Sequence, residues 1–362
     1  GIFATDGSIV NASGTNDSDS TITVTGKYTK PSTNAPTGGT NGSRPNDPNP
    51  SGSNYGIVGI SKGRVDYNVD DAGNLINSID ITSTNTTIKV DGGVSLKGAA
   101  TATGIFAKND SADKDKVTVK YDDSKLTSAG IELQNAGSSA SSRGVGIALV
   151  NQDPNGNGGI ITLNGHPGNL GSATNTDNNI ITKENGIGIY GENADIILKS
   201  DKFTITTKDD GVGIWVTDNA KIAEHANHTK TFEYNYEGKN NKNGFAMVFG
   251  GRNTQVTTAS NDLDIKFNNA GKTITLVDER AGLTGTPSGT SKGIAGILVN
   301  TGSNDTVINK GHIKEEGSTT NVRSYGAVVN RGKLKNYGNI KVRGRGTYGV
   351  SYKDISAADL AA

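Results

Sequence analysis

The amino-acid sequence predicts an all-β fold, a right-handed parallel β-helix (a β-solenoid) with protruding loops. Three observations predict it. The chain is rich in glycine and poor in apolar residues, its apolar residues alternate at a spacing of two, and one glycine-centred phrase recurs along most of its length. Together these features favour short stacked strands over helices.

The amino-acid composition limits what kind of core the chain can form and which classes of partner it can attract. Of 362 residues, 50 are glycine and only 32% are hydrophobic, which is too little apolar material for a core of long helices. Short Ile and Val runs still recur, so the chain has something to bury and disorder is not expected. Lys plus Arg and Asp plus Glu both number 36, and this balance creates no overall field to attract nucleic acid or an anionic membrane. Cysteine is absent, which favours an extracellular protein that crosses an envelope unfolded.

The recurring phrase is a glycine followed by alternating apolar residues, as in "NGIGIYGENADI" at Asn185 and "DGVGIWVTDNAKI" at Asp210. Most gaps between copies are 23 to 26 residues, about twice that, or one unit with an insertion, a period typical of solenoids. The gap of 14 residues between two copies, at Gly130 and Gly144, predicts that one of these glycines lies on another face. The copies begin at Gly56, Gly104, Gly130, Gly144, Gly186, Gly211, Gly244, Gly293, Gly326 and Gly349.

One unit predicts the shape of a turn. The stretch "YGAVVNRGKLKNYGNIKVRGRG", residues 325–346, divides at its glycines into "AVVN", "KLKNY" and "NIKVR". Three short strands per unit form one turn of a β-helix, and successive turns stack at about 4.8 Å with alternate side chains in a narrow core. Glycine and asparagine supply the corners, where positive φ is required.

Strict alternation predicts which residues of each phrase face the core. The small residues between the apolar ones would then face outward and leave room either for a loop lying over this face or for a shallow groove. The groove would be bordered by Tyr190 and Trp215, which we expect to stack on each other and to offer their faces to a sugar ring. The predicted inward pairs are Ile187 and Ile189, Val212 and Ile214, Phe245 and Met247, and Val145 and Ile147, and the predicted outward small residues are Gly146, Gly188, Gly213 and Ala246.

Two segments depart from the repeat within this single predicted domain. A Pro/Gly/Asn-rich insertion at about residues 29–54 holds five of the eight prolines and almost no apolar residues, which predicts a protruding loop. The segment at about residues 223–243 is too polar for a core turn, and its "TFEYNYEG" predicts an outward hairpin or an aromatic-tipped loop. Tyr234 and Tyr236 are therefore candidate binding residues.

A run of basic residues near the C-terminal end of the chain, called here the basic strip, has no acid among its members. Within "KLK" and "KVR" the charges share strand parity, so they face outward together. One interpretation is edge protection or solubility. The other is a docking strip for an anionic glycan or an acidic protein. The strip comprises Arg331, Lys333, Lys335, Lys341, Arg343 and Arg345.

The sequence contains short matches to catalytic and metal-binding motifs, but each lacks the neighbouring residues or secondary structure that the motif requires. "GTSKG" around Ser291 lacks the strand before and the helix after that a nucleophile elbow needs. The calcium-loop imitation at 153–164 ends in asparagine where a bidentate glutamate is required. His225 and His228 lie in a polar loop without a clear third ligand. We therefore expect no enzyme activity, no metal and no cofactor.

The sequence resembles the passengers of large fusobacterial autotransporter adhesins, the RadD-like class of type V secretion. The likeness lies in phrases such as "GIGIYGENADI", "YGAVVNRGKLKNYGNIKVRGRGTYGV" and "NTGSNDTVINKGHIKEEG", and it covers most of residues 56–352. It implies an N-terminal signal, a long surface-exposed passenger and a C-terminal outer-membrane barrel. Its motifs belong to a fold, and it brings no catalytic residues with it. We expect this chain to be an excised piece of such a passenger.

These observations predict a cell-surface adhesin segment that attaches to host cells or other bacteria through its loops and outer faces. The expected partner is a protein or glycan receptor, with no nucleic acid and no embedding of the passenger in the membrane, and the expected state is a monomer. Two alternatives remain, a polysaccharide-cleaving β-helix enzyme and a purely structural or self-associating stalk. The enzyme would need acid or base groups gathered in one groove, whereas the acids of this chain are scattered.

Overall fold

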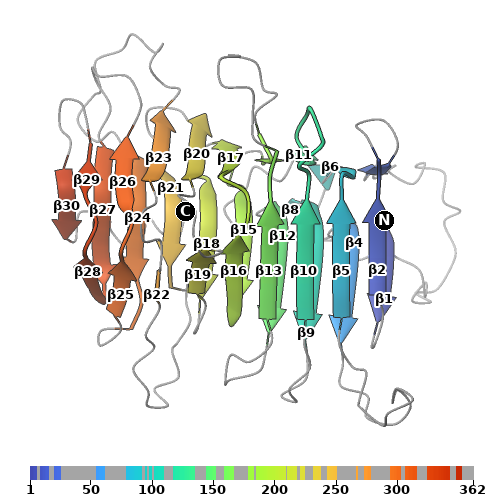
Figure 1. The fold of residues 1–362 in the computed structure, drawn as a ribbon, viewed down its shortest axis with the longest axis horizontal. Coiled ribbons are helices and arrows are strands. Elements are labelled where there is room, and N and C mark those ends of the chain that lie inside the picture. The colour runs from blue at the N-terminus through green and yellow to red at the C-terminus, as the bar shows by residue number, and fades with distance from the viewer. Residues whose placement is uncertain are drawn as a thin grey trace, which may run out of the picture.

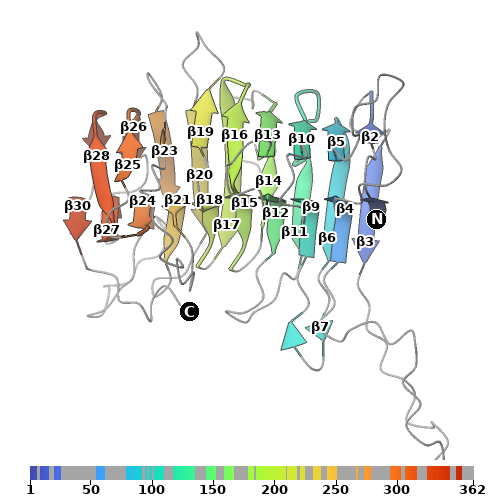
Figure 2. The same cartoon turned by 90° about the horizontal axis from the view of Figure 1, so that it is seen from below.

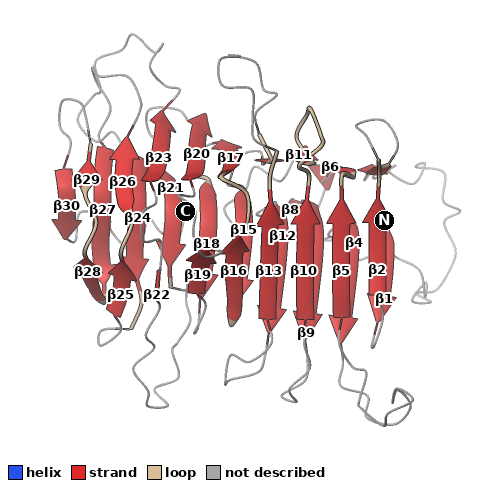
Figure 3. Ribbon diagram, viewed as in Figure 1, coloured by secondary structure: helices blue, strands red, loops and turns tan. Residues whose placement is uncertain are grey.

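The structure, a computed structural model, contains only β-strands as regular elements in the part that it describes (Figure 3). No helix in that part is long and apolar enough to cross a membrane. The described residues are 1–5, 9–15, 20–25, 54–61, 79–91, 94–95, 98–99, 102–109, 117–134, 144–151, 159–166, 178–182, 185–208, 210–217, 221–224, 231–237, 243–250, 266–267, 273–278, 294–302, 306–315, 324–342 and 348–352.

Three long parallel sheets form the molecule. The first, sheet A, has ten strands, and sheets B and C have nine each. In order along the sheet, sheet A contains β1 (Ile2–Thr5), β4 (Asn54–Ser61), β9 (Ala102–Asn109), β12 (Val145–Asn151), β15 (Ile187–Glu192), β18 (Val212–Thr217), β21 (Gly244–Phe249), β24 (Ile294–Asn300), β27 (Ser324–Arg331) and β30 (Tyr348–Tyr352).

Sheets B and C run beside it. Sheet B contains β2 (Ile9–Ser13), β5 (Ile79–Thr84), β10 (Val117–Asp122), β13 (Gly159–Asn164), β16 (Ala194–Leu198), β19 (Lys221–Glu224), β22 (Lys266–Phe267), β25 (Thr306–Asn309) and β28 (Lys333–Asn336). Sheet C contains β3 (Thr21–Thr25), β6 (Thr87–Asp91), β11 (Ile131–Gln134), β14 (Ile180–Ile181), β17 (Lys202–Lys208), β20 (Thr231–Glu237), β23 (Thr273–Asp278), β26 (His312–Glu315) and β29 (Ile340–Lys341). A small antiparallel pair, β7 (Val94–Ser95) and β8 (Gly98–Ala99), stands apart.

The chain visits the three sheets in a constant order. After each strand of sheet A it enters sheet B, then sheet C, and then returns to sheet A one position further on. The turns therefore stack along the long axis from β1 to β30, as Figure 1 and Figure 2 show from two sides. This is the parallel β-helix that the sequence predicts. The irregular copy of the phrase is also explained, because Gly130 leads into β11 of sheet C whereas Gly144 leads into β12 of sheet A.

Columns of stacked side chains fill the interior. Each register pair places equivalent residues of neighbouring turns side by side, so isoleucine lies on isoleucine through much of the stack. The main column of sheet A is Ile57, Ile105, Ile147, Ile189, Ile214, Met247 and Ile297, and the facing column of sheet C is Ile88, Ile131, Ile180 and Ile205, all fully buried.

The predicted direction of two of the three assigned residues in each phrase is wrong. Ile189, Ile214, Met247 and Ile147 face the core as expected, but the residues two positions earlier belong to a separate apolar cluster on the outer face of sheet A. The misassigned residues are Ile187, Val212, Phe245 and Val145, together with Gly146, Gly188, Gly213 and Ala246, which face inward rather than out.

Steric crowding explains this departure. A Cβ added to Gly188 would lie 2.5 Å from Cγ2 of Ile205 and 2.7 Å from the carbonyl oxygen of Gly213 in the next turn. Gly146 meets Ile180 and the Gly188 carbonyl in the same way, at 2.6 and 2.5 Å. The glycine and the residue after it both lie on the core side, so the regular alternation of a strand breaks at every phrase.

Asparagine marks the corners, as predicted. Asn85, Asn185 and Asn193 have φ values of 45, 55 and 49°. At the corner between sheets A and B, Nδ2 of Asn109 donates to Oδ1 of Asn151 at 3.0 Å, and Nδ2 of Asn193 donates to the Asn151 carbonyl at 3.1 Å. The first bond links side chains of adjacent turns, and the second satisfies a backbone carbonyl at the end of β12.

Candidate binding surfaces

The outer face of sheet A is apolar over most of its length. Its side chains form two columns that cross the strands, and most members are 8% exposed or less. This face differs from an ordinary outward strand face, which is polar. Its members are Val145, Ile187, Tyr190, Val212, Trp215, Phe245, Val248, Ala295, Leu298, Tyr325 and Val328.

Tyr190 and Trp215 lie on this face as register partners in β15 and β18, so the expectation that they are neighbours one turn apart is confirmed. Their ring centroids are 6.2 Å apart, but the planes make an angle of 75°. This edge-to-face contact is a common packing arrangement of aromatic rings. It does not form the flat platform over which a sugar ring was expected to lie.

Trp215 is held as a packing residue. Its side chain is only 8% exposed, and its indole Nε1 donates a hydrogen bond to the carbonyl of Gly250. Tyr190 is half-buried, and its hydroxyl donates to Oε2 of Glu192 at 2.9 Å. Both polar atoms are therefore already used within the fold.

Tyr234 and Tyr236 are core residues, and the predicted outward hairpin is wrong. They lie on β20, which pairs in parallel with β17 and β23, and both side chains are fully buried. The Tyr234 hydroxyl lies 2.7 Å from Oγ1 of Thr207 and donates to the Gly211 carbonyl at 2.9 Å. The alternation of Phe232, Tyr234 and Tyr236 at a spacing of two carried this signal, which the surrounding polar residues obscured.

Other predicted loop regions lie outside the described residues. These are residues 29–53 of the insertion and the parts of the polar excursion at 225–230 and 238–242. Asn54, the last residue assigned to the insertion, begins β4, and its Nδ2 donates to the Asp91 carbonyl at 2.7 Å.

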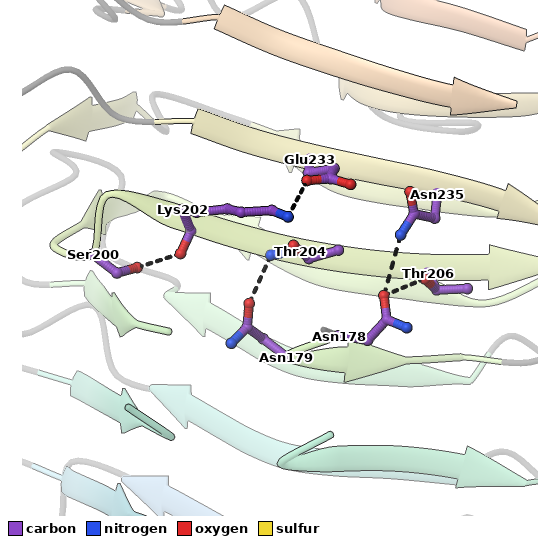
Figure 4. Close-up of polar contacts among 8 residues, drawn as sticks. All are labelled: Asn178, Asn179, Ser200, Lys202, Thr204, Thr206, Glu233 and Asn235. Carbon is purple, nitrogen blue, oxygen red and sulfur yellow. Dashed lines mark hydrogen bonds and ion pairs between the residues drawn. The ribbon is translucent and has the colours of Figure 1, made fainter. Parts of the chain in front are cut away.

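A polar cluster that the sequence did not predict lies across three strands of sheet C (Figure 4). Oδ1 of Asn178 accepts hydrogen bonds from Thr206 Oγ1 at 2.5 Å and from Asn235 Nδ2 at 3.2 Å. Beside it, Lys202 Nζ lies 2.5 Å from Oε2 of Glu233 on the next turn. The cluster joins adjacent turns through side chains, and both charged groups in it are paired.

A second polar cluster occupies the corner between sheets B and C. Asp123 is fully buried, accepts hydrogen bonds from Tyr121 Oη at 2.8 Å and from Asn179 Nδ2 at 2.9 Å, and accepts the backbone N–H of His166 at 3.1 Å. Burial raises the pKa of Asp123 to about 6, while the His166 charge and these hydrogen bonds oppose the increase. His166 is 5% exposed and its Nε2 has no hydrogen-bond partner among the described residues. The described residues contain no group of three His, Cys, Asp or Glu that could hold a metal ion.

The basic strip lies on the last described turn. Arg331 ends β27, Lys333 and Lys335 lie on β28, and Lys341 lies on β29; all four are exposed. Leu334, between the two lysines of β28, packs against the core, which confirms that Lys333 and Lys335 share the outward face. Arg343 and Arg345 lie outside the described residues.

Two lysines of the preceding turn extend this surface. Lys310 is exposed beside β25, and Lys314 on β26 is the register partner of Lys341. In the ranges 306–315 and 324–342 the one acidic residue is Glu315, which is 2% exposed and accepts a hydrogen bond from Ser324 Oγ. The shortage of acidic residues in these ranges is visible in the sequence, but only the strand register shows that Lys314 and Lys341 are adjacent. We call the set Lys310, Lys314, Arg331, Lys333, Lys335 and Lys341 the basic end.

Charge is distributed unevenly along the stack. Residues 241–362 contain 16 Lys and Arg against 9 Asp and Glu, whereas residues 121–240 contain 9 against 15. The overall balance therefore conceals a positive third of the chain, the third to which the basic end belongs.

Comparison with known proteins identifies no relative. No family model, no curated protein and no solved structure matches the chain.

Proposed function

We propose that this chain is a surface-exposed segment of a bacterial adhesin, held outside the outer membrane, that attaches to a protein or glycan on host cells or other bacteria. The observation that carries the proposal is the basic end, a group of mostly exposed cations near which the described residues place no exposed acid, whereas two lysines elsewhere pair with glutamates of the neighbouring turn. Lys89 and Glu132 are 3.8 Å apart on neighbouring turns, and Lys202 and Glu233 are 2.5 Å apart.

The architecture supports a binding role. A solenoid displays side chains on long continuous faces and keeps their spacing constant from turn to turn, which suits recognition of an extended partner. The resemblance to type V adhesin passengers points the same way.

Attachment of the chain to cells tests the proposal. Beads coated with the 362-residue chain are offered to a panel of host epithelial cells and bacteria, and attached beads are counted as the salt concentration rises. We expect attachment that weakens steeply above physiological salt, because exposed charges are screened over about 8 Å there. Deleting residues 29–53 in a parallel sample tests the contribution of the insertion.

The opposite results are also defined. A folded chain that coats beads but attaches to no cell in the panel contradicts an adhesin and favours a structural stalk. Shortening of a polysaccharide by the chain in solution would instead support the cleaving enzyme.

A further inference from the structure

We propose that the basic end binds an anionic polysaccharide, a linear glycan bearing sulfate or carboxylate groups, which runs around the solenoid across the corner between sheets B and C. The inference rests on the proposed attachment function and specifies the chemistry of the partner.

Four cations of the basic end are available for an external anion. Arg331, Lys333, Lys335 and Lys341 are exposed, and none of them forms an ion pair with a residue that the structure describes. Lys333 and Lys335 share the outer face of β28, so their charges reinforce each other's potential.

The charge of these exposed residues decides the class of partner. In the ranges 306–315 and 324–342 the one acidic residue, Glu315, is buried, so no exposed acid in these ranges offsets Arg331, Lys333, Lys335 and Lys341. An anionic partner would complement this charge, which is why we assign an anionic partner and not a neutral one.

An exposed aromatic ring lies between the cations and points to a sugar. Tyr337 is 71% exposed at the corner between Lys335 on β28 and Lys341 on β29. Aromatic faces pack against the apolar faces of sugar rings at small entropic cost. An acidic peptide would need only the charges, so the tyrosine favours a polysaccharide.

The corner that carries Tyr337 is tightly fixed. Its backbone N–H donates to the Asn309 carbonyl at 2.8 Å, and Asn336 Nδ2 donates to the Gly338 carbonyl at 2.6 Å. A Cβ on Gly338 would overlap the Gly311 carbonyl oxygen, so the corner lies directly against the preceding turn. The backbone that carries the ring is therefore fixed before a ligand arrives, which lowers the cost of binding.

The extent of the surface requires a polymer. Extended strands advance about 3.3 Å per residue, so the path from Arg331 to Lys341 around the solenoid is roughly 30 Å. This length spans several sugar units and separates the proposed ligand from a single monosaccharide.

Binding to heparin, a sulfated polysaccharide, tests the inference with purified components. The variant Lys333→Ser, Lys335→Ser, Lys341→Ser is compared with Lys120→Ser, Lys125→Ser, Lys199→Ser, which removes the same charge from exposed lysines elsewhere on the stack. We expect Kd at physiological ionic strength to rise about tenfold or more in the first variant and less than about twofold in the second. An equal loss in both variants, with both folded by circular dichroism, overturns the assignment to the basic end.

The aromatic contribution and the ligand class have separate tests. Tyr337→Ala is expected to weaken heparin binding about threefold, whereas Tyr348→Ala, which removes another half-exposed tyrosine on β30, leaves it unchanged. Neutral dextran is expected not to bind. If single-stranded DNA or polyglutamate binds the chain as tightly as heparin does, or if Tyr337→Ala has no effect, the assignment to a polysaccharide is wrong.

Failure of this inference differs from failure of the proposed function. Cell attachment that persists in the Lys333, Lys335, Lys341 variant, with heparin binding absent in the parent, leaves the adhesin and removes the anionic glycan. Heparin binding that behaves as expected without attachment to any cell supports the site and contradicts the adhesin.

Discussion

Single residues decide how closely one turn can approach the next. Gly188 has no room for a side chain, because a Cβ there would lie 2.5 Å from Ile205 Cγ2 and 2.7 Å from the Gly213 carbonyl. Gly191, on the same strand, has its nearest neighbour at 3.4 Å, an ordinary contact distance. The two glycines therefore have different reasons to be present.

Gly188→Ala is expected to destabilise the fold by about 1–3 kcal/mol, because the neighbouring turn must shift to admit the methyl group. Gly191→Ala is the matched control and is expected to change stability little. The measurement is the midpoint of unfolding in urea for both variants. Ala246 occupies the equivalent position one turn after Gly213, so the lower part of the range is expected if the backbone adjusts as it does there. Equal midpoints for the two variants would contradict the crowding argument.

Asp123 makes stability depend on pH in an unusual direction. The pKa of Asp123 is about 6 in the folded chain, against an ordinary value of 3.8. Between about pH 4 and pH 6 the folded state therefore holds a proton on this carboxyl group that the unfolded state has lost. The contribution of Asp123 to the free energy of unfolding is at its maximum below about pH 4. It is lost as the pH rises through about 6. A shift of about two pKa units corresponds to about 3 kcal/mol.

Asp123→Asn should remove this loss and raise the unfolding midpoint at neutral pH. The amide can keep the same contacts, since Oδ1 accepts from His166 and Asn179 while Nδ2 donates to Tyr121 Oη, whose proton goes to the Asn179 carbonyl at 3.0 Å. The test is the difference in thermal midpoint between variant and parent as a function of pH. A difference that does not change between pH 4 and 7 would show that Asp123 does not titrate in this window.

Asp122 provides a control of opposite sign. Burial tends to raise its pKa, but hydrogen bonds from Ser124 and Asn164 outweigh that effect and lower it. Its stabilising contribution is present above the ordinary pKa of an aspartate and is lost as the pH falls. Asp122→Asn is therefore expected to destabilise the chain at neutral pH and to have little effect in acid.

Strands derive their stability from position within the columns. Ile214 on β18 is fully buried between Ile189 and Met247, whereas Ile197 on β16 is half-buried on the outer face of sheet B. The same substitution of isoleucine by aspartate at the two sites separates the effect of burial from the effect of the residue change itself.

Ile214→Asp is expected to cost more than about 4 kcal/mol, because it buries an unpaired charge and leaves a void. Ile197→Asp should cost less than about 1 kcal/mol. Soluble yield and the urea midpoint measure both effects. Similar losses at the two positions would contradict the assigned faces of the strands.

Trp215 reports on the outer face of sheet A. It is the single tryptophan of the chain, so its fluorescence is unambiguous. We expect emission at the short wavelengths of a buried indole, weak quenching by iodide, and no change on adding glycans, since the ring is packed and its Nε1 is bonded to Gly250. Long-wavelength emission that iodide quenches freely would show that this face is open.

The sequence predicted the stacking of strands because the repeated phrase and the alternation of apolar residues at a spacing of two can both be recognised without knowing which distant residues are in contact. It failed at Ile187 and Phe245, because alternation assumes a regular pleat and the glycine column interrupts it. It also missed Asp123, whose partner Asn179 is 56 residues away. Contacts between residues so far apart depend on the register between neighbouring turns. That register depends on where insertions begin and end, which a single sequence does not reveal.

The whole molecule is a one-dimensional stack, so its turns need not be equally stable. Side chains in the end turns are far more exposed than those in the middle, as at Phe3 (67%), Ile9 (70%) and Tyr348 (50%). We expect amide hydrogen exchange of the 362-residue chain to slow from both ends towards the central turns, because end turns have a neighbour on one side only. Uniform protection along the stack, measured by mass spectrometry, would contradict this gradient.

The direction of the hydrogen bonds in sheets A, B and C has a mechanical consequence. Because every pairing in these sheets is between turns, tension applied along the stack pulls those bonds apart along their own direction, and the weakest turn boundary separates first. A turn of 23 residues, such as that from Gly326 to Gly349, occupies about 4.8 Å of the stack when folded and extends to about 80 Å when peeled away. Under a dragging load the molecule would lengthen in steps and dissipate work, whereas a rigid rod would break at once.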